Sequence, residues 1–254
     1  MKSNYLHQWR ITKYNPMLRD EDGTYLLKDE WTSCSDIGKL SSGKEFTLDE
    51  YLKTEQAYVN AVMAFMAEEE IRYLRVVQLN QHEMDEEEKQ SPLYKEFTDI
   101  ITQEDMAVMK EDAPTLLRML LREYIHCQLL HKDNFFIHIG YDYYMYIGST
   151  NPSLKGIAVT KELGLFVEEM ESPYYVEERN IERVLQWAIK GEDEIVSEEE
   201  LNIPLVLYRS VFGLSEEHPI TGVFKVERPH IKELHMYIKH ECNFDRYDYS
   251  IAAM

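Results

Sequence analysis

Side chains suited to metal or acid–base chemistry gather between positions 131 and 142, where His131, Asp133, His138 and Asp142 fall within one short stretch. His138 and Asp142 are four residues apart. Residues at even separations along a strand share a face, so these two side chains could meet at one metal ion. The chain has no HExxH motif to support such a site. We therefore expect a hydrogen-bonded histidine in a half-buried strand and no metal.

Other combinations of reactive side chains are equally weak. Glu168, Glu169 and Glu171 follow a predicted strand, where paired carboxylates can transfer protons or bind a cation. Cys127 lies near His126 and His131, but we place it in an apolar helix, where a thiol packs. Ser33, Ser35 and Asp36 lack a GxSxG turn, and neither GxxxxGK[ST] nor GxGxxG occurs. The sequence predicts no catalytic residue and no cofactor, and it favours a protein that is not an enzyme.

Charge is the strongest compositional signal. The 254 residues include 27 Lys and Arg against 47 Asp and Glu, a formal net charge of −20. Such a chain repels the phosphates of nucleic acids and anionic lipids, and it attracts basic proteins. Its three cysteines, Cys34, Cys127 and Cys242, are widely spaced and form no CxxC pair, as expected for free thiols in a reducing compartment. We find neither a signal peptide nor a membrane span and expect a cytoplasmic protein.

Aromatic residues suggest where a partner would bind. Eighteen tyrosines occur, several of them between positions 141 and 146. Tyrosine and tryptophan supply large contact areas at low entropic cost, and acidic side chains at the rim steer a basic partner. The predicted partner-binding residues are Trp31, Asp142, Tyr144, Tyr146, Glu168 and Glu169.

These features favour a non-enzymatic, acidic binding protein that neutralises a basic protein partner. In composition the chain is similar to the immunity proteins of bacterial toxin systems, which are acidic, poor in cysteine and of mixed α and β structure. The resemblance implies an immunity protein, an antitoxin or a phage inhibitor of a defence protein, and it includes no diagnostic motif. Two alternatives remain: a metal-assisted hydrolase using His138, Asp142 and Glu168, and a structural or assembly component.

The first half of the chain alternates between patterns typical of strands and helices. Alternation around Trp9 predicts a strand over His7–Tyr14. Thr47 and Glu50 form a capping box, and the apolar spacing that follows predicts a helix to about Glu69. A strand is expected over Ile71–Leu79, a short helix near Gln103–Lys110, and a helix from Pro114 to about Leu130.

The second half begins with dense β-forming residues. Strands are expected over 135–139, 141–147, 157–160 and 165–169. Helices are expected over 176–190, after a second capping box at Ser197–Glu200, and from Pro229 to about Glu241. Strands at 222–226 and 246–254 complete the pattern.

Together these elements predict an α+β fold, in which a mostly antiparallel sheet is covered by helices. We expect a single compact domain over residues 1–254, or two intimate halves of about 1–175 and 176–254. Residues 126–143 and 235–249 share His-x4-His, Asn-Phe and Tyr-Asp-Tyr in the same order. This similarity raises the hypothesis of a weak internal duplication of a helix–loop–strand unit.

Overall fold

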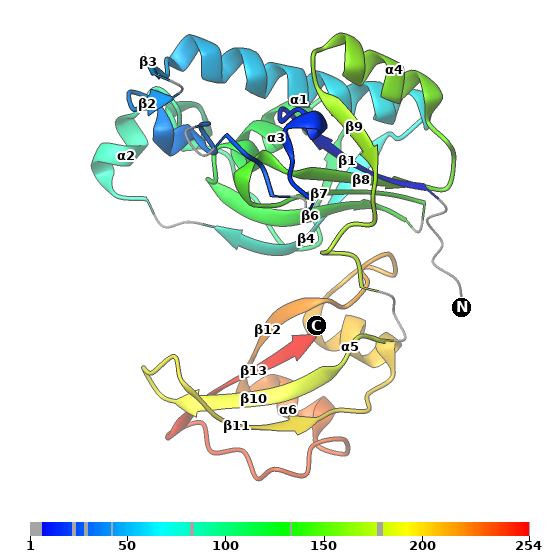
Figure 1. The fold of residues 1–254 in the computed structure, drawn as a ribbon. Helices are drawn as coiled ribbons and strands as arrows, with labels where there is room; N and C mark the ends of the chain where they lie inside the picture. The colour runs from blue at the N-terminus through cyan, green and yellow to red at the C-terminus, as the bar shows by residue number, and fades with distance from the viewer. Residues whose placement is uncertain are drawn as a thin grey trace. The chain divides into compact units, whose positions relative to one another are not determined.

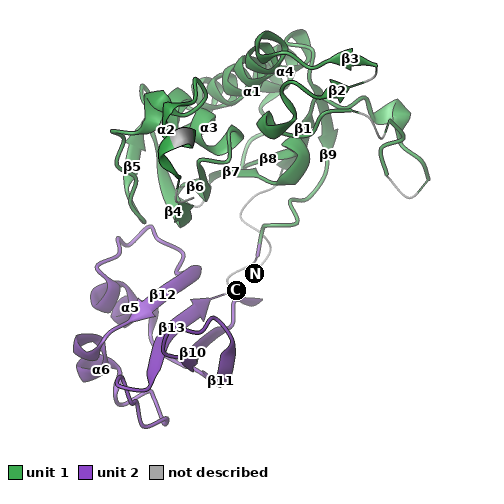
Figure 2. Cartoon of the chain, turned by 90° about the vertical axis from the view of Figure 1, so that its left-hand side faces the viewer, with its two compact units in different colours: residues 1–175 green, residues 176–254 purple. Residues whose placement is uncertain are grey.

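The computed structural model describes residues 7–21, 24–27, 30–41, 43–81, 84–132, 134–176 and 180–253. The chain forms two compact units, Met1–Tyr175 (unit 1) and Val176–Met254 (unit 2), coloured green and purple in Figure 2. Each unit contains an antiparallel sheet and helices, which confirms the α+β class (Figure 1).

Unit 1 is built on a seven-stranded sheet. Its strands, in spatial order, are β5 (Ala107–Met109), β4 (Tyr73–Gln81), β6 (Ile125–His131), β7 (Phe135–Ile139), β8 (Met145–Ser149), β1 (His7–Thr12) and β9 (Phe166–Glu169). The helices α1 (Leu48–Glu68), α3 (Ala113–Leu121) and α4 (Leu154–Glu162) lie over one face of this sheet (Figure 1). A short helix α2 (Glu86–Gln90) and a small hairpin of β2 (Leu40–Ser41) and β3 (Lys44–Glu45) complete the unit.

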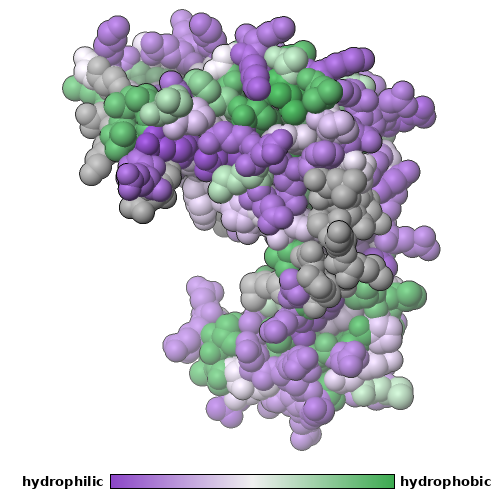
Figure 3. Space-filling model, turned by 45° about the vertical axis from the view of Figure 1, so that its right-hand side comes forward, coloured by the Kyte–Doolittle hydropathy of each residue, from purple (hydrophilic) through white to green (hydrophobic). Residues whose placement is uncertain are grey.

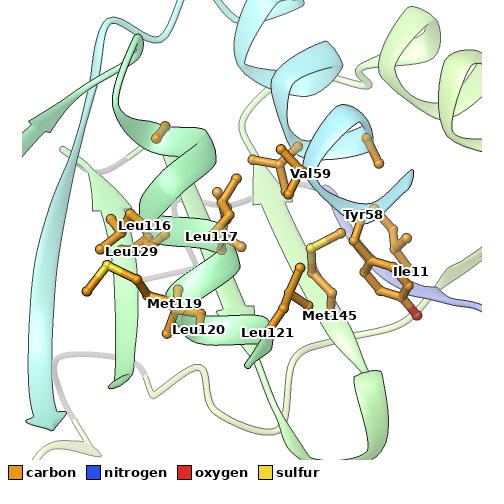
Figure 4. Close-up of a cluster of buried hydrophobic side chains, with 14 of the residues drawn as sticks. Ile11, Tyr58, Val59, Leu116, Leu117, Met119, Leu120, Leu121, Leu129 and Met145 are labelled. Atoms are coloured by element: carbon orange, nitrogen blue, oxygen red, sulfur yellow. The ribbon is translucent and has the colours of Figure 1, made fainter. Parts of the chain in front are cut away.

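The core of unit 1 lies between these helices and the sheet. Alternate strand residues, such as Ile11 and Met145, point toward the helices and are fully buried. Figure 4 shows Tyr58 and Val59 of α1 and the leucines of α3 meeting these strands. α4 packs closely on α1 because Gly156 has no side chain: a Cβ there would lie 2.9 Å from the Phe65 ring.

Helix α1 begins as its sequence predicts. The hydroxyl of Thr47 accepts the backbone N–H of Glu50, and the Glu50 carboxylate accepts the N–H of Thr47. These two bonds satisfy donors that a helix start otherwise leaves unpaired. The predicted strands at 7–14, 71–79, 135–139 and 165–169 are also confirmed, with ends that differ by a few residues.

Unit 2 is a four-stranded antiparallel sheet with two helices. The spatial order is β11 (Ile195–Glu200), β10 (Arg183–Ile189), β13 (Tyr247–Ala253) and β12 (Gly222–Val226). Helices α5 (Leu205–Phe212) and α6 (Arg228–Leu234) cover one face and enclose a second hydrophobic core around Tyr208 and Ile251. β13 pairs with both β10 and β12, so the predicted closing strand is confirmed and occupies an interior position.

Several predicted helices are strands in the structure. The segment expected as a helix over 176–190 contains β10, which pairs with β13 along its whole length and places Leu185 in the core and Trp187 against it. The capping box expected at Ser197–Glu200 lies on β11, an edge strand, whereas the helix expected after it is confirmed as α5, which begins only at Leu205. The short helix near 103–110 contains β5, which pairs with β4.

Other boundaries also differ. The helix from Pro114 ends at Leu121, where Glu123 takes a positive φ of 58° and the chain turns into β6. Cys127 therefore lies on a strand, where it is buried. The strand expected over 157–160 is part of α4, and the helix from Pro229 ends at Leu234. The predicted strand over 141–147 is a 3-10 turn at Tyr141–Tyr143 followed by β8.

The two similar segments do not share a local structure. His126 and His131 lie on β6, whereas His235 and His240 follow helix α6. The first Tyr-Asp-Tyr is a 3-10 turn and the second begins β13. The sequence similarity therefore does not reflect a repeated helix–loop–strand unit.

Candidate functional site

Four of the six predicted partner-binding residues lie near basic side chains of unit 1: Tyr144, Tyr146 and Glu168 near Arg10, and Trp31 near Lys13. Arg10 on β1 lies opposite Tyr146 of β8 and Glu168 of β9 in the sheet register. Its Nε and Nη2 donate to the two carboxylate oxygens of Glu168 at 3.1 and 3.0 Å. This is a bidentate, charge-assisted pair, so Glu168 is already engaged within the sheet.

Tyr144 lies between two guanidinium groups. Its ring centroid is 5.4 Å from the Cζ of Arg10 and 5.3 Å from that of Arg19, and Arg19 donates to its hydroxyl at 3.0 Å. Tyr144 also contacts Tyr14, whose hydroxyl donates to the carbonyl of Trp31. These contacts fix the Tyr144 side chain and leave it half-buried.

Trp31 lies next to Tyr14, but its side chain points into the core. It is only 9% exposed and stacks on Phe46, with ring centroids 4.3 Å apart. Tyr146 is 6% exposed. As the chain is folded, neither side chain offers the large accessible surface that a binding anchor needs. Sequence reasoning placed both at a surface because it could not tell a packed aromatic residue from an exposed one.

The two remaining predicted residues are on the surface. Asp142 is exposed at the tip between β7 and β8, where it has a positive φ of 57°. Glu169 is exposed on β9. Asp142 contributes to the electrostatic environment of Lys13, so it belongs to the same region, whereas Glu169 lies opposite Trp9 on the edge strand.

Lys13, which directly follows β1, is the most unusual ionisable group of this region. Its Nζ is 2.7 Å from Oε1 of Glu30 and lies 3.9 and 4.2 Å from the ring centroids of Trp31 and Tyr14. Burial lowers the pKa of Lys13 to about 8, although Glu30, Asp36 and Asp142 each favour its charged form. Sequence reasoning missed Lys13, since no motif marks a lysine that tertiary packing dehydrates.

Lys13 lines a pocket of about 500 Å³ in unit 1. The pocket is bounded by the loop that carries Glu30 and Trp31, the β2–β3 hairpin, the first turns of α1 and the turn between α4 and β9. A perturbed ionisable group in a pocket of this size is a recurrent property of ligand-binding and catalytic sites.

The residues proposed for metal-assisted hydrolysis do not converge. His138 is buried, and its Nδ1 is hydrogen-bonded to Oγ of Ser172 at 2.8 Å, while Glu168 is paired with Arg10. Burial lowers the pKa of His138 to about 3, which keeps it neutral. His131 bonds the carbonyl of Tyr73, and Asp133 lies outside the described residues. Among the residues that are described, no three His, Cys, Asp or Glu side chains form a metal-binding group.

The other candidate reactive side chains have structural roles or lie exposed on the surface. Burial raises the pKa of the Cys127 thiol, so it stays protonated and a packing role is the better interpretation. Ser33 caps a 3-10 turn together with Asp36. Glu171 is exposed beyond the end of β9.

The β10–β11 hairpin of unit 2 is a second candidate region, where the acidic side chains are not ion-paired within the described residues. Residues 192–200 contain six acids: Glu192, Asp193, Glu194, Glu198, Glu199 and Glu200. All are exposed except Glu199, which is half-buried and accepts the backbone N–H groups of Lys239 and His240. Ile195 and Val196 are also exposed, at 45% and 51%.

β11 presents unpaired backbone as well as charge. It is the outer strand of its sheet, and no other strand in the described part of the chain pairs with its free side. Leu201 donates its N–H to the carbonyl of Arg183. Since hydrogen-bonded positions alternate along an antiparallel ladder, the backbone groups of Glu198 and Glu200 point to the free edge. The same two residues therefore offer both carboxylates and open hydrogen-bonding groups.

The remaining surface is hydrophilic over much of the face drawn in Figure 3. Within the described residues, none of the helices combines the length and apolar character that crossing a bilayer requires.

A family model described as a domain of unknown function (DUF7683) matches residues 182–252. The matched range runs from the start of β10 almost to the end of β13, within unit 2. No curated protein and no solved structure matches the chain significantly. The similarity is therefore to a domain that coincides with the sheet and helices of unit 2.

Proposed function

We propose that the protein is a non-enzymatic binding protein that neutralises a basic protein partner, as an immunity protein or an antitoxin does. The observation that carries this proposal is the free edge of β11. There, open backbone groups and an excess of carboxylates occur on the same short strand.

Two physical effects support a basic, extended partner segment. A free sheet edge binds an incoming strand through main-chain hydrogen bonds. A net charge of −20 attracts basic proteins over long range, and the six acids of residues 192–200 concentrate that attraction at the edge. Lys190, in the turn between β10 and β11, is the basic residue nearest to these acids in sequence.

The charge distribution in unit 1 supports the same choice of surface. The buried Arg122 and the partly buried Arg10 and Lys13 are each paired with a carboxylate inside the unit. Within the described residues, the acids on the β10–β11 hairpin have no such internal partners except Gln186, which donates to Glu198, and the backbone that binds Glu199. A partner with Lys or Arg side chains would supply the missing countercharge.

The test uses the full chain as bait in native lysate of the cells that make it, with two variants. Glu198→Pro/Glu200→Pro removes the outward N–H groups and the charges but leaves the ladder to β10, because edge prolines are tolerated where the N–H faces solvent. Glu198→Gln/Glu200→Gln removes the charges alone.

We expect the wild-type chain to capture a basic protein, the glutamine variant to capture it more weakly, and the proline variant to lose it. A Glu216→Gln variant, at an exposed acid elsewhere in unit 2, serves as the control and should bind normally. An acidic captured protein, or equal capture by the proline variant and the wild type, would contradict the proposal.

A further inference from the structure

The pocket beside Lys13 is lined by three lysines and three glutamates. Lys13, Lys44 and Lys53 all line it, and they come from three different segments: the end of β1, the β2–β3 hairpin and the second turn of α1. Convergence of three lysines on one cavity is unexpected for a protein with a net charge of −20.

Two of the three carboxylates of the pocket already have hydrogen-bond partners. Glu30 is paired with Lys13, and Glu50 closes the capping box with Thr47. Glu45 has no such partner within the described ranges, and neither Lys44 nor Lys53 is ion-paired there. Within the described ranges Lys44 and Lys53 thus remain available to an anion, while the three lysines and three glutamates of the pocket balance in formal charge.

Lys13 is placed to interact strongly with an added anion. Its side chain is 9% exposed, and one carboxylate and two aromatic rings replace most of its water. A charge in such surroundings interacts more strongly with a ligand than a fully hydrated charge does. A lysine ammonium also has three donors, of which Glu30 takes one.

The remaining walls are largely apolar. Trp31, Phe46, Ala57 and Leu165 line the cavity, which has a volume of about 500 Å³. Sites for small molecules combine such walls with a few polar groups that fix the ligand's orientation.

From this arrangement we propose that the pocket binds a small organic anion, with its carboxylate or phosphate group held by Lys13, Lys44 and Lys53 and its apolar body against the half-buried Ala57 and Leu163. The site is independent of the β11 edge, so each proposal can fail without the other.

Calorimetric titration of the full chain distinguishes the chemistry of the ligand. The probes are phenylacetate and phenyl phosphate as anions, phenylacetamide as the neutral analogue, and phenethylamine as the cation. We expect saturable binding of at least one anion with a dissociation constant of roughly 0.1 to 1 mM, as suits a fragment of this size. The preferred anion tells a carboxylate from a phosphate ligand. The neutral and cationic probes should bind more weakly.

Variants locate the binding. Lys44→Gln/Lys53→Gln changes two exposed side chains and should weaken anion binding about fivefold, and Lys13→Met should weaken it about tenfold. Lys155→Gln/Lys225→Gln, which changes the charge equally at exposed positions outside the pocket, should bind like the wild type. No saturation by either anion up to about 10 mM would overturn the proposal, since the binding free energy would then be weaker than about 3 kcal/mol. So would a preference for phenethylamine, or unchanged binding by Lys44→Gln/Lys53→Gln.

Discussion

Charged residues differ in burial and pairing between the two units. In unit 1, Arg122 is buried and donates to both carboxylate oxygens of Glu55, which is itself 2% exposed, and it is also paired with Glu96. In unit 2, the acids of the β10–β11 hairpin stand in water beside a free strand edge. Removing half of a buried pair leaves a dehydrated charge, whereas removing an exposed acid changes little in the fold. The first arrangement stabilises a structure and the second is available to a partner.

The largest expected effect comes from deleting residues 247–254. β13 lies between β10 and β12, so its removal eliminates the ladders that hold unit 2 together. We expect unit 2 to unfold while unit 1 remains folded. Trp187 lies in unit 2, and Trp9 and Trp31 lie in unit 1, so three indole resonances report on the two units separately. If the Trp187 resonance kept its native position, β13 would not have the role assigned to it.

The next largest effect concerns the buried pair. Arg122→Met leaves Glu55 without its countercharge and should lower the free energy of unfolding by about 3–5 kcal/mol, measured by denaturant titration. The matched control is Arg228→Met, because Arg228 pairs with Asp245 on the surface. That change should stay within about 1 kcal/mol. Equal effects of the two substitutions would remove the contrast between buried and exposed charges.

A pH effect follows from His138. Burial lowers its pKa in the folded chain to about 3, against an ordinary value of 6.5, so the unfolded chain binds a proton first as the pH falls. Its contribution should be absent above about pH 6.5 and should destabilise the fold progressively down to about pH 3. On the order of 3 kcal/mol is expected by pH 4, since one pKa unit corresponds to about 1.4 kcal/mol.

His138→Gln provides the comparison, because other groups also titrate in this range. The difference in unfolding free energy between wild type and variant, measured from pH 7 to pH 4, should narrow or reverse as the pH falls. A difference that is constant with pH would show that His138 does not remain neutral in the folded chain.

Sequence patterns predicted unit 1 better than unit 2 because the signals in unit 1 are local. Thr47 and Glu50 satisfy each other's backbone within one turn, so the start of α1 could be found without tertiary information. In unit 2, Val184, Leu185 and Ala188 fit a helical spacing, but pairing with β13 makes the segment a strand. Ser197 and Glu200 have the spacing of a capping box and instead lie on β11.

The candidate sites depended even more on tertiary structure. Tyr144 and Glu168 were identified by type, but their common contact, Arg10, became evident only when β8, β1 and β9 were placed side by side. The acids of β11 are visible in the sequence as a run of glutamates, which the pattern placed in a capping box at the start of a helix. In the structure this run forms the free edge of a sheet, where its backbone and side chains are accessible to a partner.

The central claim, that the acidic edge of β11 attracts a basic partner, is tested most directly by association kinetics. The captured partner is mixed with wild-type chain and with Glu198→Gln/Glu200→Gln at 0.1 M and 1 M salt. At ~0.1 M the Debye length is about 10 Å and at ~1 M about 3 Å, so steering acts only at the lower concentration. We predict that wild-type association is about tenfold faster at low salt, that the variant loses most of this advantage, and that the two chains converge at high salt. A wild-type association rate that is indifferent to salt, or identical rates for both chains at low salt, would contradict the account.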